Sequence, residues 1–200
     1  MSWIKIIPVK QAKGRLKKLY GRLVTSDGQV DNIMQAHSLR PHSMEGHMAL
    51  YKNVLHHSAN SVNRWFLEAL GVYVSCLNHC EYCSAHHFAG MKALIADDDR
   101  ALTIMCAFEA DDPAAAFEGK ELAALFYARA LTRAPSELSE ETIENMRTSG
   151  WDDGEILEIN QVVAYFAYAN RTVLGLGVDM GDEALGLSPS GDGDDDWGHA

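Results

Sequence analysis

The sequence predicts an all-α protein with no significant β-sheet. Apolar residues recur at spacings of three and four along nearly all of its 200 residues, whereas the alternation typical of strands is nearly absent. Prolines, glycines and acidic or serine caps divide this pattern into segments of helix length. We therefore expect helices at 9–24, 31–38, 43–57, 62–77, 80–95, 98–107, 119–133, 139–148 and 153–174.

Turn and cap residues set the boundaries in the first half of the chain. The clustered basic residues from Lys10 to Arg22 are interpreted as the solvated face of the first helix. Pro41 follows the short second helix, and Asn78 occupies the position of an N-cap. Cys80 and Cys83 should then lie in the first turn of the next helix.

Similar signals divide the second half. Asp111-Asp112-Pro113 interrupts the helical pattern, and residues 135–140 supply serine and acidic caps for another helix. Ser149-Gly150 is a stop, and Asp152 or Asp153 can start the last long helix.

We expect one globular domain, because 200 residues with 47% hydrophobic content suffice for one good-sized core. We place a helical domain at 1–178, with its redox core at about 40–108, and a C-terminal tail at 179–200. The tail is acidic and rich in Gly and Asp, which predicts poor order, although Trp197 could dock on the body.

Charge and hydropathy exclude several classes of partner. The net charge of −11 argues against nucleic acid, which would need a concentrated basic face. The apolar run from Trp3 to Val9 is broken by Lys5 and Pro8 and is too short for a signal segment or membrane span. We therefore expect a soluble, cytoplasmic protein with no membrane partner.

In a reducing compartment its four cysteines are not expected to form structural disulfides, and a close pair is more often catalytic or metal-binding.

The segment SCLNHCEYCSAHH, residues 75–87, contains Cys80 and Cys83 in CxxC spacing, followed by His86 and His87. At a helix start, unpaired N–H groups and the positive dipole end stabilise a thiolate, the reactive form of cysteine. Cys80, Cys83 and His87 are three and four residues apart, so they share one helix face. His86 points about 100° away and is the weaker candidate.

Helical-hairpin geometry adds Glu68 to this group. If the helices on either side of His79 pack antiparallel, Glu68 lies 11 residues before the turn and His87 lies 8 after it. The mismatch of roughly 4–5 Å is within side-chain reach. Glu68 could therefore polarise His87, one turn from Cys83. Such a relay suits peroxide reduction, in which a thiolate attacks the O–O bond, an acid protonates the departing oxygen and a second cysteine forms a disulfide.

Other chemistries also use a CxxC motif. Zinc could be bound by the two cysteines and two histidines of this segment, but structural zinc sites usually use two separated ligand pairs. A thioredoxin motif would follow a strand, and a c-type haem site would need a histidine where Ser84 stands. We therefore predict neither a metal nor a cofactor. The cysteines of the motif could also be packing residues, an interpretation that we prefer for Cys76 and Cys106.

These residues resemble the AhpD-like, carboxymuconolactone-decarboxylase-related superfamily, and most of all its peroxidase-related branch. The family motif is a glutamate, a CxxC twelve residues later and a histidine four residues after the second cysteine, and it is matched by Glu68, Cys80, Cys83 and His87. Tyr82 stands where some members have a histidine. The likeness extends to about Val178 through Leu39-Arg40-Pro41, Ala169-Asn170-Arg171 and Leu176-Gly177-Val178.

The resemblance implies an AhpD-like helical bundle that assembles into trimers or hexamers and reduces hydrogen peroxide or organic hydroperoxides. It implies that Glu68 and His87 relay protons to the thiols, that Cys83 attacks the peroxide and that Cys80 resolves the product. A lipoylated or thioredoxin-like partner would supply the electrons. Decarboxylases of this superfamily lack the cysteine pair, which argues against lactone decarboxylation.

Two alternatives remain: a non-enzymatic thiol redox sensor or disulfide-exchange module, and a metal-binding structural domain. Outside the motif, four further residues could line a pocket, although such residues more often lie at the surface: Arg40, His42, His47 and Arg171.

Overall fold

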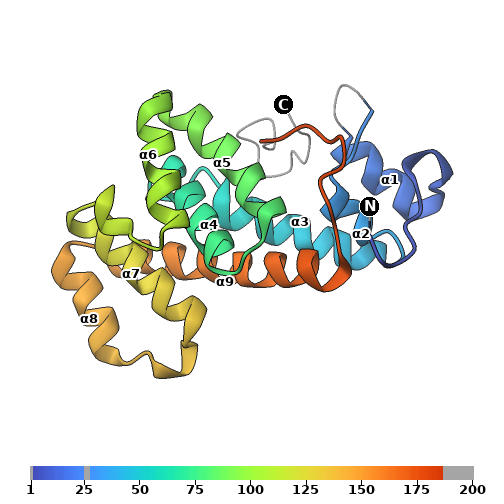
Figure 1. The fold of residues 1–200 in the computed structure, drawn as a ribbon. Coiled ribbons are helices and arrows are strands. Elements are labelled where there is room, and N and C mark those ends of the chain that lie inside the picture. Colours follow the sequence, from blue (N-terminus) through green and yellow to red (C-terminus); the bar gives the residue numbers. More distant parts are fainter. Residues whose placement is uncertain (1, 25–27, 187–200) are drawn as a thin grey trace.

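The computed structural model describes residues 2–24 and 28–186, and in them every regular element is a helix (Figure 1). The all-α prediction is therefore confirmed. The α-helices are α1 (Gly14–Leu23), α2 (Asn32–Ala36), α3 (Pro41–Leu55), α4 (Arg64–Leu77), α5 (Glu81–Ile95), α6 (Asp98–Glu109), α7 (Gly119–Arg133), α8 (Glu140–Ser149) and α9 (Asp153–Leu176). Short 3-10 turns lie at Val9–Gln11, Pro113–Ala115 and Pro135–Glu137.

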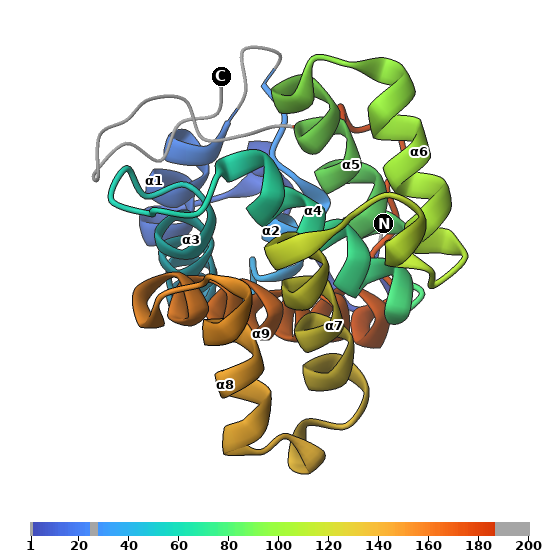
Figure 2. The same cartoon turned by 90° about the vertical axis from the view of Figure 1, so that its left-hand side faces the viewer.

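Helix α4 forms the centre of the molecule. Its residues from Phe66 to Ser75 are all buried, as expected for a helix that is apolar on every side. It packs against α5, α6, α7 and α9. The long helix α9 runs the length of the protein, with α1 to α3 at one end and α7 and α8 at the other (Figures 1 and 2). The α4–α5 hairpin is thus surrounded by helices from distant parts of the sequence.

The start and end of α9 follow from its sequence. The Asp152 carboxylate accepts from the Glu155 backbone N–H at 2.8 Å. In return, the Glu155 carboxylate accepts from the Asp152 backbone N–H at 3.0 Å. This reciprocal capping satisfies donors that have no partner inside the helix. At the other end Gly177 takes the left-handed conformation, with φ of 59°, and stops the helix.

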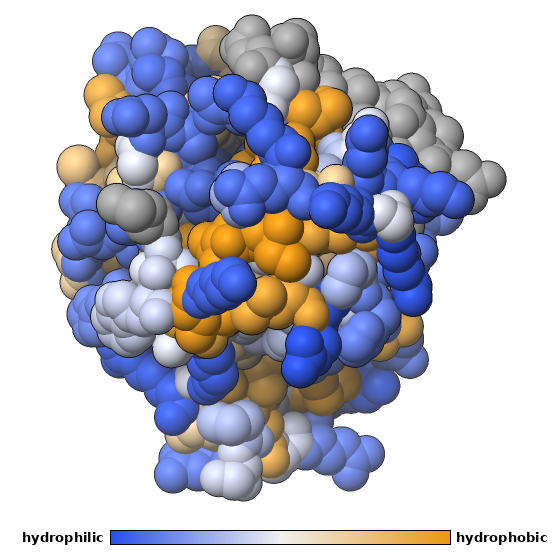
Figure 3. Space-filling model, turned by 90° about the vertical axis from the view of Figure 1, so that its right-hand side faces the viewer, coloured by the Kyte–Doolittle hydropathy of each residue, from blue (hydrophilic) through white to orange (hydrophobic). Residues whose placement is uncertain are grey.

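The first expected helix, 9–24, is divided in two. Pro8 leads into a 3-10 turn, Ala12 and Lys13 are extended, and α1 begins only at Gly14, whose φ of +56° suits a glycine. The solvated-face prediction is confirmed: Arg15, Lys17, Lys18 and Arg22 are exposed. Figure 3 shows the molecule from this end, where a hydrophilic surface surrounds one apolar area.

Residues 179–186 do not behave as the expected loose tail. The Asn32 side-chain amide donates to the carbonyls of Asp179 and Met180, at 2.9 and 3.0 Å. Glu183 accepts from the Asn32 backbone N–H and from His86, each at 2.7 Å. This segment is therefore bound against α2 and α5. The rest of the predicted tail, with Trp197, lies outside the described residues.

Among the residues described, no helix is both long enough and apolar enough to cross a membrane.

Candidate redox site

The two cysteines of the motif lie at the turn between α4 and α5. His79 takes a left-handed conformation, with φ of 55°, and reverses the chain. Cys80 is then the N-cap residue of α5 and Cys83 lies in its first turn. The expected N-cap, Asn78, instead ends α4, and its side-chain amide nitrogen donates to the side-chain oxygen Oδ1 of Asn170 at 2.9 Å. The prediction that the helix begins at the cysteines holds, but Asn78 ends α4 and binds Asn170 of α9 rather than capping α5.

Asn170 is a member of the site that the motif alone did not identify. It is completely buried, and its amide nitrogen donates to the Ser75 hydroxyl at 3.1 Å. Its side chain also lies within hydrogen-bonding reach of Cys80 and Cys83, where it favours their thiolate forms. A lone asparagine on the buried, otherwise apolar face of α9 is the signal that could have identified it.

Cys80 and Cys83 are free thiols that share one hydrogen bond. Donation from Cys83 lowers the pKa of the Cys80 thiol, and Asn170 adds to this effect. Conversely, the hydrogen bond to Cys80, together with burial, raises the pKa of Cys83 well above its usual value. The first proton therefore leaves Cys80, and the remaining proton stays on Cys83.

The expected contact between Glu68 and His87 is present. His87 Nδ1 lies 2.6 Å from Glu68 Oε2, and the Glu68 side chain is 2% exposed. Burial alone would raise the pKa of Glu68, but His87, His56 and Arg64 outweigh it and hold that pKa below its ordinary value. The carboxylate therefore accepts from Nδ1 of His87, and Nε2 is left for other partners.

Neighbouring side chains fix the positions of this pair. The His56 ring nitrogen Nε2 lies 3.9 Å from the other Glu68 oxygen. The Phe166 ring meets the His87 ring edge-on, at a centroid distance of 4.5 Å. On the α5 side, Gly90 faces the carboxylate, and a Cβ there would lie 3.5 Å from Glu68 Cδ, an ordinary van der Waals distance.

Cys83 and the Glu68–His87 pair open into a common cavity of about 50 Å³. Apolar and aromatic side chains form most of the remaining wall: Ile33, Met34, Met48, Tyr51, Tyr82 and Tyr165. Cys80 does not line this cavity. It lines a separate, more open groove of about 250 Å³ between the α4–α5 turn and the end of α9.

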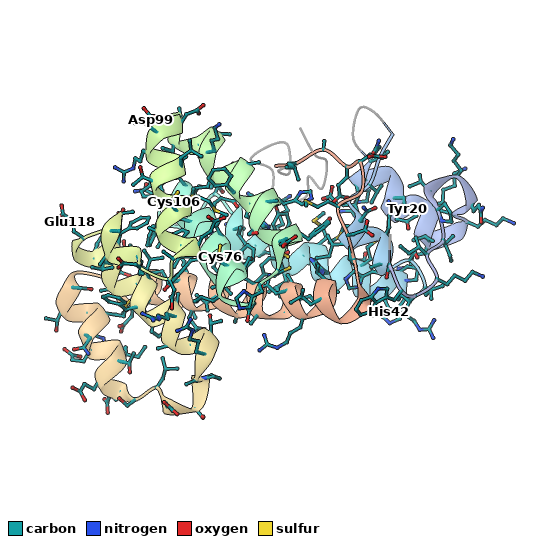
Figure 4. All side chains as sticks on the ribbon, viewed as in Figure 1. Tyr20, His42, Cys76, Asp99, Cys106 and Glu118 are labelled. Carbon is teal, nitrogen blue, oxygen red and sulfur yellow. The ribbon has the colours of Figure 1, made fainter. Side chains whose placement is uncertain are left out.

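A second group of polar side chains also reaches the cavity wall, through His47 and Tyr165. Nε2 of His47 lies 3.0 Å from the Tyr165 hydroxyl, and its Nδ1 lies 3.1 Å from Nε2 of His37. Of the four possible pocket residues outside the motif, His47 is thus buried and lines the cavity. The others are exposed, as His42 is near the start of α3 (Figure 4): Arg40, His42 and Arg171.

The remaining candidates divide as follows. Nε2 of His86 lies 2.7 Å from Glu183 Oε1, and His86 also lines the cavity that Cys83 lines. Cys76 is half-buried against the core, as a packing residue would be. Cys106 is exposed on α6, so its assignment to the core was wrong: it and Leu102, one turn earlier, face outward (Figure 4). The described residues contain no group of three or more His, Cys, Asp or Glu side chains arranged to hold a metal ion.

Comparison with known proteins finds relatives by structure only. No family model matches the sequence, and no curated protein matches it. Among solved structures, an AhpD core protein from Ralstonia eutropha, described as an uncharacterised peroxidase-related protein, is 19% identical with a TM-score of 0.78 over 90% of this chain and 93% of that one. A peroxidase-related protein from Silicibacter sp. is 21% identical with a TM-score of 0.76 over 90% and 92%.

A third structure of this kind comes from a different enzyme. The debrominase Bmp8, solved as a cysteine-to-alanine variant with 2,3,4-tribromopyrrole, is 15% identical with a TM-score of 0.65 over 91% of this chain and 95% of that one. The resemblance stated from the motif is thus confirmed at the level of structure: the chain has the helical fold of the AhpD core and of the peroxidase-related proteins.

Proposed function

We propose that the protein is a thiol-dependent peroxidase that reduces hydrogen peroxide or small organic hydroperoxides through Cys80 and Cys83. The observation that supports this most is the common cavity, in which Cys83 meets the hydrogen-bonded pair of Glu68 and His87. A thiol, an imidazole and a carboxylate at one small cavity provide the nucleophile and the acid that O–O cleavage requires.

The chemistry would proceed in two steps. The Cys83 thiolate attacks one peroxide oxygen, the O–O bond breaks, and the departing hydroxide or alkoxide takes the Nε2 proton of a doubly protonated His87, whose Nδ1 proton stays in the hydrogen bond to Glu68. The Cys80 thiolate then attacks the Cys83 sulfenic acid, an S–S bond forms and water leaves after protonation. An external dithiol reduces the disulfide and returns both thiols, so that one peroxide and one dithiol yield an alcohol, water and a disulfide.

The cavity and the separate groove support different roles for the two thiols. Cys83 lines the enclosed cavity beside His87, so a peroxide there meets Cys83 first. Cys80 lines the other groove, from which a dithiol can attack the disulfide. Cys83 as the attacking thiol and Cys80 as the resolving one is therefore our assignment. A lipoylated or thioredoxin-like protein is the reductant that the family resemblance implies.

Cavity size favours small substrates. A cavity needs roughly 10–15 Å³ to hold one water. About 50 Å³ therefore gives room for hydrogen peroxide or for the O–O end of a small hydroperoxide. A ring with three bromine atoms, such as the ligand of the debrominase with this fold, would require the walls to move apart. For this reason we prefer a peroxide to a halogenated aromatic substrate.

The decisive experiment measures peroxide loss in the presence of excess dithiothreitol, with mass spectrometry of the cysteines after single additions of peroxide. We expect repeated turnover and a Cys80–Cys83 disulfide. Cys83→Ser should abolish turnover, whereas Cys80→Ser, assayed after removal of the dithiol, should consume one peroxide and accumulate Cys83 sulfenic acid. A Cys83→Ser variant that retains full turnover would contradict the mechanism.

The same experiment separates the alternatives. A redox sensor or disulfide-exchange module would oxidise once and stop, even with reductant in excess. A metal-binding domain would contain zinc by elemental analysis when purified without chelator. The proposed trimer or hexamer is tested independently by light scattering.

A further inference from the structure

The proposed mechanism leaves one proton without a route. The pair retains a proton on Cys83, the thiol that faces the cavity, while Cys80 ionises first. Cys83 must lose this proton before it can attack. His87 is bound by Glu68 as a donor, and it is the acid required for the departing oxygen. A second group that accepts a proton at the cavity could remove the Cys83 proton, while His87 remains the acid for the departing oxygen.

A chain of hydrogen bonds leads from Tyr165 and His47 on the cavity wall to His37 and Ser43, and all of its bonds have the same direction. The Ser43 hydroxyl donates its only proton to the Arg40 carbonyl, at 2.8 Å. It must therefore accept from Nδ1 of His37, 3.1 Å away, and this leaves His37 Nε2 as an acceptor. His47 then donates from Nδ1 to His37 Nε2, and its own Nε2 accepts from the Tyr165 hydroxyl.

Each donor in this chain points from Tyr165 toward Ser43. Burial, with a contribution from His37, lowers the pKa of His47 to about 3, so the ring is neutral as the chain of donors requires. The Tyr165 hydroxyl uses its proton on His47, so its oxygen lone pairs remain for the cavity, which Cys83 also lines. Tyr165 and Cys83 also interact electrostatically, since a charge on Cys83 raises the pKa of Tyr165.

We propose that Tyr165, His47 and His37 form a second proton relay, independent of Glu68 and His87, that carries the Cys83 proton out of the cavity. The inference rests on the proposed redox role of Cys83. The Cys83 S–H bond breaks and the proton joins the Tyr165 oxygen, Tyr165 passes its own proton to His47 Nε2, and His47 passes its Nδ1 proton to His37. The products are a Cys83 thiolate and a His37 imidazolium, and no electrons change hands.

Of the two histidines, His37 is the one that tolerates a positive charge better, although burial lowers its pKa as well. His37 is half-buried at the end of α2, in contrast to the fully buried His47. Tyr165 is the member of the relay that shares the cavity with Cys83, whereas His47 and His37 are positioning residues that act through it. The other titratable groups around Tyr165 and His47 are Tyr51 from α3, Glu68 from α4 and Tyr168 from α9. The shared cavity is also lined by four further titratable side chains: Asp31, Tyr82, His86 and His87.

Two variants interrupt the relay at opposite ends. Tyr165→Phe removes the hydroxyl at the end of the relay that shares the cavity with Cys83. His37→Gln keeps a hydrogen-bonding side chain beside His47 but cannot become an imidazolium. Tyr168→Phe is the matched control, because its ring also contacts His47, at 5.3 Å between centroids, without a place in the hydrogen-bonded chain.

The readout is the rate of Cys83 alkylation by iodoacetamide between pH 6 and 10 with both cysteines present, and mass spectrometry separates alkylation at Cys83 from alkylation at Cys80. This measurement needs no peroxide, so it remains informative even if peroxide is not the substrate. We expect Tyr165→Phe and His37→Gln to react 10- to 100-fold more slowly at pH 7. Both should return to the parent rate at high pH, where hydroxide removes the proton directly.

Further outcomes decide the proposal. In the parent, the pH 7 rate should fall at least twofold in D₂O, and this effect should shrink in both variants. Parent-like rates in Tyr165→Phe or His37→Gln would overturn the relay. Slowing by the same factor at every pH would also overturn it, because that is the result of a purely structural role.

Discussion

His87 Nδ1 lies 2.6 Å from Glu68 Oε2, although the two residues are 19 positions apart in the chain. The contact joins adjacent arms of the α4–α5 hairpin, one turn beyond Cys83. Because the carboxylate accepts from Nδ1, the tautomer and the ring orientation of His87 are fixed together. Nε2 is then the nitrogen that can serve the cavity.

Glu68→Gln should slow oxidation of Cys83 by hydrogen peroxide about 100-fold at pH 7. The substitution keeps the shape of the side chain but removes the charge that supports a His87 imidazolium. Stopped-flow oxidation kinetics measure the effect. Glu158→Gln is the matched control, because that carboxylate accepts from the backbone N–H groups of Ser61 and Val62, away from the thiols. Equal rates in both variants would remove Glu68 from the mechanism.

The helices and the Glu68–His87 contact were predictable because both depend on information close in the sequence. Helical periodicity and cap residues locate α4 and α5, and a hairpin between two adjacent helices determines which residues face each other. The division at Ala12 and Lys13 was missed, since the apolar spacing continues across it while the backbone turns at Gly14. Boundaries that depend on backbone conformation leave little trace in an apolar pattern.

The contacts that α9 makes at the site could not be predicted in this way. Tyr165 and His47 are 118 positions apart, and Asn170 reaches Ser75 across 95. Their meeting depends on how α9 packs across α3 and α4, and no local periodicity specifies that packing. Likewise, Glu183 binds His86 because residues 179–186 pack back on α5, despite a composition typical of a loose tail.

Asn170→Asp should raise the pH at which the cysteine pair becomes reactive to alkylation by about 1–2 pH units. The native amide favours both thiolates, whereas a carboxylate at the same position would repel them. Alkylation rates measured against pH give the midpoint. Asn160→Asp is the control on the same helix, since Asn160 donates to the Tyr127 hydroxyl. If both variants retain the parent midpoint, Asn170 has no electrostatic role at the thiols.

His47 should make the fold sensitive to acid. Its pKa falls from 6.5 in the unfolded chain to about 3 in the folded protein, because burial, and then His37, disfavour the imidazolium. Between these values the unfolded state binds a proton that the folded state does not, so stability is lost as the pH falls below 6.5. The loss is about 1.4 kcal/mol per pH unit, or about 2 kcal/mol by pH 5.

His47→Gln should therefore flatten the pH dependence of the free energy of unfolding between pH 6.5 and 4. Urea denaturation at several pH values measures this slope, which is independent of any loss of stability common to all pH values. The control is His42→Gln, an exposed histidine on the same helix, which should retain the parent slope. A slope that is unchanged in His47→Gln would show that His47 binds its proton equally well in both states.

Gly71 makes a packing contact on which the site depends. A Cβ at this position would overlap the ring of Phe166, which also meets the His87 ring in a T-shaped contact. Gly71→Ala should therefore cost about 1–3 kcal/mol of stability, the usual range for overpacking a core. Gly46→Ala on α3 should be neutral or stabilise by up to about 1 kcal/mol, because nothing lies within 4 Å of a Cβ there.

The Phe166 contact extends this prediction from stability to activity. A displaced Phe166 ring no longer holds His87 against Glu68, so Gly71→Ala should also slow oxidation of Cys83 under conditions in which the variant is fully folded. Phe166→Leu in the Gly71→Ala background should restore much of the stability by removing the overlap, yet not the rate, because the ring that supports His87 is still absent. Recovery of both together would mean that Phe166 only fills space.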